Sequence, residues 1–504
     1  MNTIFKKTYL QLLIIILFAG LGSFTKLNQT ELQPLGSSVH ASVSREILRT
    51  GDWLTLHWPY CEEFKDFYQF PPLFFWLTAI TYKIFGINDF AAKFVSSLFG
   101  FLVIILTYYL GKILINNYAG FLSSMTVILT PYFFRHSRKC ELETILIFFI
   151  TLSFIFFVIA EKNNKEKFVL LTGFSVGLGF LSKGPPAFCV WPAIILYYLL
   201  TKQYKKIFGI YLWSGILISI FVPMLWIIPQ IIYKGDEFYQ KYIINQIFWS
   251  LQGRSAITTD LISKIKGYTF YLTAFFSYYL PWSITGIFGV YKIIKQKFKT
   301  LYILILWVII VWFGFTIAGY KDDYYLLAFW PGWSIINGFI FANWTYKIQN
   351  KLIFTFFIIF IIFAVSVTFT QLKFDKSRNP EIKILSQYIN KYVPENERLI
   401  TYNMFYYDMA GLILWYADRG VMPSKIPDPK ISPDAKAWKC KSIDTQEELQ
   451  TIISTTTPKY LLIKKDDFKN LNEKIKQKLF IITSEGRFIF AANIPERQSY
   501  NKKK

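Results

Sequence analysis

Phe70-Pro71-Pro72-Leu73-Phe74-Phe75-Trp76-Leu77 marks the point where a polar, acidic and aromatic segment gives way to an apolar run. The preceding segment, residues 26–70, carries His, Trp and carboxylate side chains in a 504-residue chain that is 53% hydrophobic and 20% aromatic. Charged groups are unusual beside the first apolar segments of so apolar a chain. We therefore expect the chemistry of this protein to lie near this stretch.

Outward from this stretch, apolar residues come in blocks of about 17 to 25, the length that crosses the hydrocarbon of a bilayer. The sequence predicts a polytopic α-helical membrane protein with about 11–13 transmembrane helices. The shorter run 71–87 we expect to be half-inserted, unless the span count is wrong by one. The expected full spans are 8–25, 92–111, 118–135, 143–160, 167–182, 186–201, 207–231, 268–291, 301–318, 325–343 and 352–370.

The net charge of +23 would suggest a nucleic-acid partner in a soluble protein. Here the lysines cluster in short loops between apolar blocks, as the positive-inside rule expects, so we expect no nucleic acid. The first span lacks a small-residue cleavage site, and we expect it to be retained. The charge pattern places on the outer face the tail and the loops 26–70, 136–142, 232–266 and 319–324.

Composition divides the chain into a membrane domain, residues 1–374, which includes the first outer loop 26–70, and a polar tail, residues 375–504. Pro380 and Glu381 begin a helical pattern, so the tail is expected to be a small, soluble extracytoplasmic α/β domain. Its short strands are expected at 398–402, 460–463, 480–483 and 488–492. In the first loop, residues 39–48 predict a short surface helix that ends at Gly51.

Two ionisable residues lie at the ends of apolar runs. Glu143 begins the run 145–160, and Lys183 ends a span just before Gly184-Pro185-Pro186. A charge in such a position is costly unless it is paired or functional. Lys183 either extends to lipid head groups or binds a phosphate, for which a compact ammonium is well suited. For the other outer-loop carboxylates, ordinary loop polarity is the simpler interpretation.

Arg254, Lys264 and Lys266 make a third outer loop basic. Carboxylates in one loop and cations in others suit a transferase with an anionic lipid-phosphate donor, since cations hold the leaving phosphate and a carboxylate takes the acceptor's proton. Loops that dock by ion pairs would show the same pattern. Nucleotide-binding and HExxH motifs do not occur, and the four cysteines show no metal spacing. We expect no metal and no cofactor.

Several blocks, in order along residues 1–345, resemble the family of aminoarabinose-lipid A transferases and protein O-mannosyltransferases, similar to glycosyltransferase family 39. The blocks in the first loop and its neighbourhood are Arg45 to Trp53, Phe70 to Leu77, Lys83 to Gly86 and Phe90 to Phe94. The later blocks are Arg138 with Glu143 to Phe149, Leu181 to Pro185, Leu280 to Ser283, and Lys321 with Tyr325 to Leu327 and Pro331.

This resemblance implies a membrane glycosyltransferase in a bacterial inner membrane. Its active site would face outward, its donor would be a polyprenyl-phosphate sugar, and its acceptor a lipid, such as lipid A, or a protein. Membrane lipids would be further partners. It assigns the donor phosphate to Arg138 and Lys183, with Arg254 as a looser match, and it makes Glu143 a candidate catalytic carboxylate.

The chain departs from the family pattern at the expected catalytic acids, whose places are taken by Gly36 and Ser37, and at Phe70, where the family has a lysine. The resemblance leaves the role of the base to Glu31, by a shift of register, or to Asp52 within the matched block. Two alternatives stay open. One is a non-catalytic lipid-binding or translocating protein on the same frame, and the other is an envelope-polymer ligase.

Overall fold

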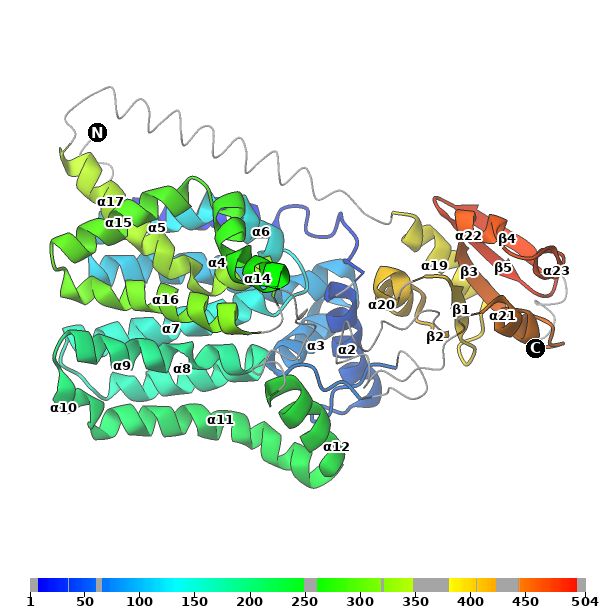
Figure 1. The fold of residues 1–504 in the computed structure, drawn as a ribbon, viewed down its shortest axis with the longest axis horizontal. Coiled ribbons are helices and arrows are strands. Elements are labelled where there is room, and N and C mark those ends of the chain that lie inside the picture. The colour runs from blue at the N-terminus through cyan, green and yellow to red at the C-terminus, as the bar shows by residue number, and fades with distance from the viewer. Residues whose placement is uncertain are drawn as a thin grey trace. The chain divides into compact units, whose positions relative to one another are not determined.

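The computed structural model describes residues 8–34, 36–59, 66–248, 261–318, 321–347, 380–404, 406–422, 443 and 445–495 (Figure 1). Backbone contacts divide the chain into two units. The membrane unit comprises Met1–Gln29 and Tyr68–Lys376, and the outer unit comprises Thr30–Phe67 and Ser377–Lys504. The first outer loop therefore groups with the tail, whereas composition had placed it with the membrane body.

The membrane unit is helical, as predicted. Five of its described helical segments are long and apolar enough to cross a membrane: Asp89–Leu114, Glu143–Lys162, Tyr204–Lys234, Lys299–Ile317 and Asp323–Trp344. Its helices are α1 (Thr8–Phe24), α3 (Leu73–Phe85), α4 (Asp89–Leu114), α5 (Asn117–Ile128), α6 (Pro131–Ser137), α7 (Glu143–Lys162), α8 (Phe168–Lys183), α9 (Val190–Leu200), α10 (Tyr204–Ile207), α11 (Ile210–Lys234), α12 (Asp236–Phe238), α14 (Leu261–Tyr278), α15 (Trp282–Lys295), α16 (Tyr302–Ile317) and α17 (Trp330–Lys347). Between them lie the 3-10 turns η1 (Pro185–Cys189), η3 (Lys299–Leu301) and η4 (Asp323–Phe329), and the π-helix η2 (Tyr239–Phe248).

Two predicted continuous spans are wrong, because each is broken near a proline. The span 118–135 divides into α5 and α6 at Pro131, and the span 268–291 divides into α14 and α15 at Pro281. Proline removes a helical hydrogen bond and disfavours helical backbone in the residue before it, although α11 continues through Pro223 and Pro229. The doubtful segment 71–87 is α3, whose 13 residues reach about 20 Å, less than the roughly 30 Å of hydrocarbon. The predicted span 352–370 lies outside the described residues.

Small residues bring the membrane helices close together, which is typical of helix packing in lipid. Gly173 of α8 faces Gly215 of α11, and a Cβ at Gly173 would lie 2.1 Å from the Gly215 carbonyl oxygen. Gly120 of α5 similarly approaches the backbone of Tyr108 in α4. The position of α8, which ends at Lys183, therefore depends on the absence of a side chain at Gly173.

The outer unit contains a five-stranded sheet in the order β2-β1-β3-β5-β4. Strand β1 (Leu399–Tyr402) is parallel to β2 (Val421–Met422) and β3 (Tyr460–Lys464), whereas β5 (Phe488–Ala492) is antiparallel to β3 and to β4 (Phe480–Glu485). The helices of the tail are α19 (Glu381–Tyr392), α20 (Tyr406–Ala417), α21 (Gln446–Ile453), α22 (Lys465–Lys469) and α23 (Glu473–Lys476). The four expected strands are confirmed, and the two-residue β2 was not predicted.

The helix expected in the first loop is α2, which spans Ser37–Thr50. Its predicted end is also confirmed, since the N–H of Gly51, at φ +73°, donates to the carbonyl of Ile47. Every side chain from Ser37 to Ile47 is buried, and the expected position of this helix at the membrane surface stays a prediction. One side of this helix packs against α20 of the tail, within the same unit.

Candidate active site

The structure brings together two of the predicted site residues, Glu143 and Lys183. The Lys183 Nζ donates to Glu143 Oε1, and each side chain is only 9% exposed. Glu143 begins α7 and Lys183 ends α8, so each charge lies where the helix dipole favours it. Gly184, at φ +98°, and Pro185 then stop α8 directly after the lysine. Two helix ends thus hold an ion pair whose members are 40 residues apart.

Two tyrosines of η4 flank this lysine. Its Nζ lies 5.2 Å from the ring centroid of Tyr324 and 4.7 Å from that of Tyr325, within range of cation–π attraction. The second carboxylate oxygen of Glu143, Oε2, is buried and has no hydrogen-bond partner among the described residues. A buried acceptor without a donor costs free energy, so this oxygen is available for a hydroxyl or a proton.

Further polar side chains lie at the same ends of the helices. His136 Nδ1 is 3.0 Å from Glu141 Oε2, and Lys139 Nζ is 3.5 Å from Glu141 Oε1. The His136 ring also contacts Tyr324, with centroids 5.2 Å apart. Burial raises the pKa of Asp322, and the charges of Asp323 and Glu143 add to this effect, against the lowering by Tyr324 and Lys183. The ends of α6, α7, α8 and η4 therefore form one polar cluster.

Arg138, a second predicted phosphate ligand, is held by hydrogen bonds to the backbone of the first helix. Its guanidinium donates to the carbonyls of Gly22 and Thr25 at 2.8 Å and of Ser23 at 3.3 Å. These carbonyls lie at the end of α1, where they lack helical partners and attract a cation. Arg138 thus caps α1, and binding of a donor phosphate would have to share or replace these contacts.

Asp52, a predicted catalytic carboxylate, is held in the first loop of the outer unit. Its Oδ1 accepts the N–H groups of Leu54 and Thr55, both at 2.9 Å, and its Oδ2 lies 2.9 Å from His57 Nε2. Burial alone would raise the pKa of Asp52, but these hydrogen bonds outweigh burial and lower it. A carboxylate with a lowered pKa is a weaker base. Asp52 is thus better suited to holding the loop than to taking a proton.

His57 connects this carboxylate to a second one. Its Nδ1 lies 2.8 Å from Asp66 Oδ1, and the hydrogen bond to Asp66, together with that to Asp52, raises the pKa of His57 despite burial. An Asp52–His57–Asp66 group was not predicted. The spacings of five and nine residues match no regular element, so nothing in the sequence indicated that these side chains meet.

The remaining predicted residues are less informative. Glu31 lies half-buried in the segment between α1 and α2, in the outer unit. Arg254 lies outside the described residues. Within the part of the chain that the structure describes, no group of three His, Cys, Asp or Glu side chains could hold a metal ion. The role of Tyr324 was missed, although the block beginning at the adjacent Tyr325 was noticed in the sequence.

Comparison with known proteins gives a consistent result. Residues 69–227, which include Arg138, Glu143 and Lys183, match the family described as dolichyl-phosphate-mannose-protein mannosyltransferase. An uncharacterized protein of Aquifex aeolicus is 24% identical over 351 residues, which are 69% of this chain and 67% of that protein. An undecaprenyl phosphate-alpha-4-amino-4-deoxy-L-arabinose arabinosyl transferase of Photorhabdus laumondii is 24% identical over 297 residues, or 57% of this chain. The match spans about half of that transferase, 51%.

Solved structures share the fold. ArnT from Cupriavidus metallidurans, bound to undecaprenyl phosphate, superposes with a TM-score of 0.75 at 14% identity, over 96% of this chain and 98% of that one. The archaeal oligosaccharyltransferase AglB from Archaeoglobus fulgidus, in complex with an inhibitory peptide and a dolichol-phosphate, gives a TM-score of 0.56 at 12% identity. That match covers 91% of this chain and 69% of AglB. The likeness extends through the tail as well as the helices.

Proposed function

We propose that this chain, which is similar to membrane glycosyltransferases that include the aminoarabinose and protein mannosyltransferases, transfers a sugar from a polyprenyl-phosphate donor to a lipid or protein acceptor at the outer face of the membrane. The observation that carries this proposal is the buried Glu143–Lys183 pair, in which Glu143 Oε2 has no hydrogen-bond partner among the described residues. Both residues lie inside the segment 69–227 that matches the family.

The reaction is a single displacement at the anomeric carbon of the sugar. A bond forms from the acceptor oxygen to this carbon while the bond from the carbon to the donor phosphate breaks, which inverts the configuration. Lys183 binds the leaving phosphate, where fixed positive charge stabilises the charge that develops. The flanking tyrosines and Glu143 hold the ammonium in place until phosphate oxygens compete for it.

A carboxylate must take the acceptor's proton. Of the three candidates, Glu143 has a buried oxygen with no donor among the described residues, while the oxygens of Asp52 accept hydrogen bonds and its pKa is lowered. Glu31 stays a candidate only because a shift of register in the match to the family pattern would place it at the position of the catalytic acid. We therefore assign Glu143 as the base or as the residue that orients Lys183, and the assay below separates these roles from those of Glu31 and Asp52.

The test uses the purified full chain in lipid nanodiscs, supplied with undecaprenyl-phosphate sugars and with lipid A or protein acceptors. Release of undecaprenyl phosphate is measured for wild type, Glu31→Gln, Asp52→Asn, Glu143→Gln and Lys183→Ala. We expect Lys183→Ala and Glu143→Gln to lose at least about 100-fold in kcat, the usual cost of removing a group that stabilises transition-state charge. Asp466→Asn, which removes an exposed carboxylate of α22, serves as the control.

Two outcomes would overturn the proposal at different levels. Full activity in all four variants would refute the site assignment while leaving the function intact. Binding of undecaprenyl phosphate without turnover of any donor would instead support the second candidate, a non-catalytic lipid-binding protein. The observation that favours this second candidate is the pair Gly36 and Ser37, which begins α2 and supplies no carboxylate.

A further inference from the structure

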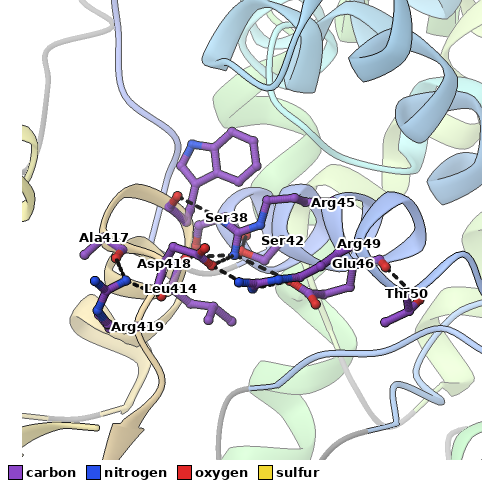
Figure 2. Close-up of polar contacts among 11 residues, drawn as sticks. Ser38, Ser42, Arg45, Glu46, Arg49, Thr50, Leu414, Ala417, Asp418 and Arg419 are labelled. Carbon is purple, nitrogen blue, oxygen red and sulfur yellow. Dashed lines mark hydrogen bonds and ion pairs between the residues drawn. The ribbon is translucent and has the colours of Figure 1, made fainter. Parts of the chain in front are cut away.

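A cluster of four charged side chains joins the first loop to the tail within the outer unit (Figure 2). Arg45 and Arg49 project from α2, and the Asp418 Oδ1 lies 2.7 Å from Arg45 Nη2 and 3.1 Å from Arg49 Nη1. Glu46, on the same helix, lies 3.6 Å from each arginine. The cluster is balanced, with two positive and two negative charges, and links segments about 370 residues apart.

Arg45 makes a second kind of contact with the tail. Its guanidinium donates to the carbonyls of Leu414 at 3.0 Å and Trp415 at 3.2 Å, near the end of α20. These carbonyls carry the partial negative charge of the helix terminus, so a buried arginine is favoured there. The same guanidinium lies 5.8 Å from the ring of Trp415. Arg45 thus fixes α2 against the last turn of α20.

The backbone conformation at Asp418 is unfavourable for an aspartate, so the contacts of the carboxylate explain why an aspartate occupies this position. It follows Ala417, the last residue of α20, and has φ +50°, in the left-handed region that favours glycine. An aspartate tolerates this conformation at some cost in free energy. This cost is offset because the carboxylate forms ion pairs with both arginines of α2. A glycine would relieve the backbone and lose these two contacts.

Hydrogen bonds continue from this cluster to the carboxylates of the first loop. Thr50 Oγ1 donates to the Glu46 carbonyl at 2.8 Å and accepts the Asp52 N–H at 3.2 Å. Asp52 in turn contacts His57 Nε2 at 2.9 Å, and His57 contacts Asp66. A contiguous path of polar contacts therefore runs from the tail to the Asp52–His57–Asp66 group.

We propose that Asp418 is a positioning residue for sugar transfer: from the tail it fixes α2 through Arg45 and Arg49, and through Thr50 it sets the orientation of Asp52 in the first loop. This inference rests on the proposed function, because only transfer gives the orientation of the first loop a catalytic consequence. Asp418 itself touches neither donor nor acceptor. Its effect is expected on turnover rather than on donor binding, because the proposed phosphate ligand, Lys183, belongs to the other unit.

Three variants of the full chain test this inference. Asp418→Asn removes the charge but keeps a side chain that tolerates a positive φ. Asp418→Gly removes the carboxylate while relieving the backbone, so a loss of function in it cannot come from strain. Asp466→Asn is the control, since it removes the carboxylate of an exposed ion pair in the same unit, with Lys469 at 3.3 Å.

In nanodiscs, we expect Asp418→Asn and Asp418→Gly to lower kcat about tenfold with an unchanged donor KM, a modest cost for a misplaced group. Asp466→Asn should match wild type. The second readout is NMR titration of His57, one of three histidines, in labelled protein. We expect the pKa of His57 in both Asp418 variants to move toward its ordinary value, because Asp52 is held less firmly.

A wild-type kcat in Asp418→Asn would overturn the inference. A lowered kcat with an unchanged His57 titration would also overturn it, since Asp418 would then not be coupled to His57 through Asp52. An equal rise in donor KM would show a general loss of structure rather than positioning, and would also overturn it. If wild type turns over no donor, the proposed function fails. The His57 titration then still decides whether Asp418 is coupled to the loop.

Discussion

Lys183 shows how far a single residue can be interpreted from sequence. Its place at the end of an apolar run, followed by Gly184-Pro185-Pro186, left two interpretations open, which were extension to lipid head groups and binding of a phosphate. The sequence also predicted a cost for Glu143. A helical hairpin brings the start of α7 and the end of α8 to the same face, but hydropathy alone does not determine that these two side chains turn toward each other. Pairing is a property of how α7 packs on α8, which no local pattern encodes.

The Asp52–His57–Asp66 group gives the first loop a stability that depends on pH. The pKa of His57 is raised, so its ion pairs contribute fully below the unfolded value of about 6.5, and this contribution is lost as the pH rises through the raised value. The pKa of Asp52 is lowered, so its contribution is present above the unfolded value of about 4 and is lost as the pH falls. Stabilisation is therefore greatest between these limits.

We predict that His57→Gln destabilises the protein more at pH 5.5 than at pH 9. The measurement is the difference in thermal unfolding midpoint between wild type and His57→Gln in detergent, taken across this range. Asp466→Asn provides the baseline, because it removes an exposed carboxylate that pairs with Lys469 and not with His57. A difference for His57→Gln that is constant with pH would show that the charge on His57 does not contribute to stability.

At the scale of elements, the sequence predicted the helices better than their continuity. Apolar runs near 92–111, 143–160 and 167–182 correspond closely to α4, α7 and α8. The breaks before α6 and α15 were missed because hydropathy averages over a window and does not register one proline. The burial of α2 was missed for a different reason, since its partner α20 lies far along the chain.

The contact between α8 and α11 leads to a prediction about stability. Gly173→Ala should destabilise the protein by about 1–3 kcal/mol, because its Cβ would lie 2.1 Å from the Gly215 carbonyl oxygen and must push the helices apart. Gly314→Ala, in α16, is the matched control. Nothing lies within 4 Å of a Cβ there, so alanine should be neutral or stabilise the helix by up to about 1 kcal/mol.

Unfolding of both variants in mixed detergent micelles gives the two free energies. Since α8 ends at Lys183, Gly173→Ala should also reduce transfer, which the undecaprenyl phosphate assay measures in parallel. Equal stability of the two variants would mean that the α8–α11 approach is not tight. The contrast between them isolates the contact, because both substitutions add one methyl group to a helix.

At the scale of the whole molecule, composition separated an apolar body from a polar tail but assigned the first loop by its position in the chain. The structure instead groups Thr30–Phe67 with Ser377–Lys504. Contacts such as Arg45 with Asp418 decide this grouping, and they join segments that composition treats as unrelated. The sheet, by contrast, was largely predictable, since β3, β4 and β5 are marked by short β-branched and aromatic runs.

This grouping predicts that the outer unit folds cooperatively only when both of its segments are present. Residues 30–67 joined to 377–504 by a flexible Gly/Ser linker should form a soluble α/β domain with a single thermal transition. The tail alone should melt at a lower temperature. It lacks α2, whose Arg45 and Arg49 pair with Asp418 and whose Ser38 lies against Gly411 of α20.

Circular dichroism of three proteins tests this: the joined unit, the tail alone, and the joined unit with Gly411→Val. A Cβ at Gly411 of α20 would lie 2.9 Å from the carbonyl oxygen of Pro34, which precedes α2, so a valine there would prevent α2 from packing on α20. The variant should therefore melt like the tail alone, although its length is that of the joined unit. If the tail alone melts at the same temperature as the joined unit, α2 adds no stability to the tail. The path from Asp418 to Asp52 would then lack the rigid helix on which positioning depends.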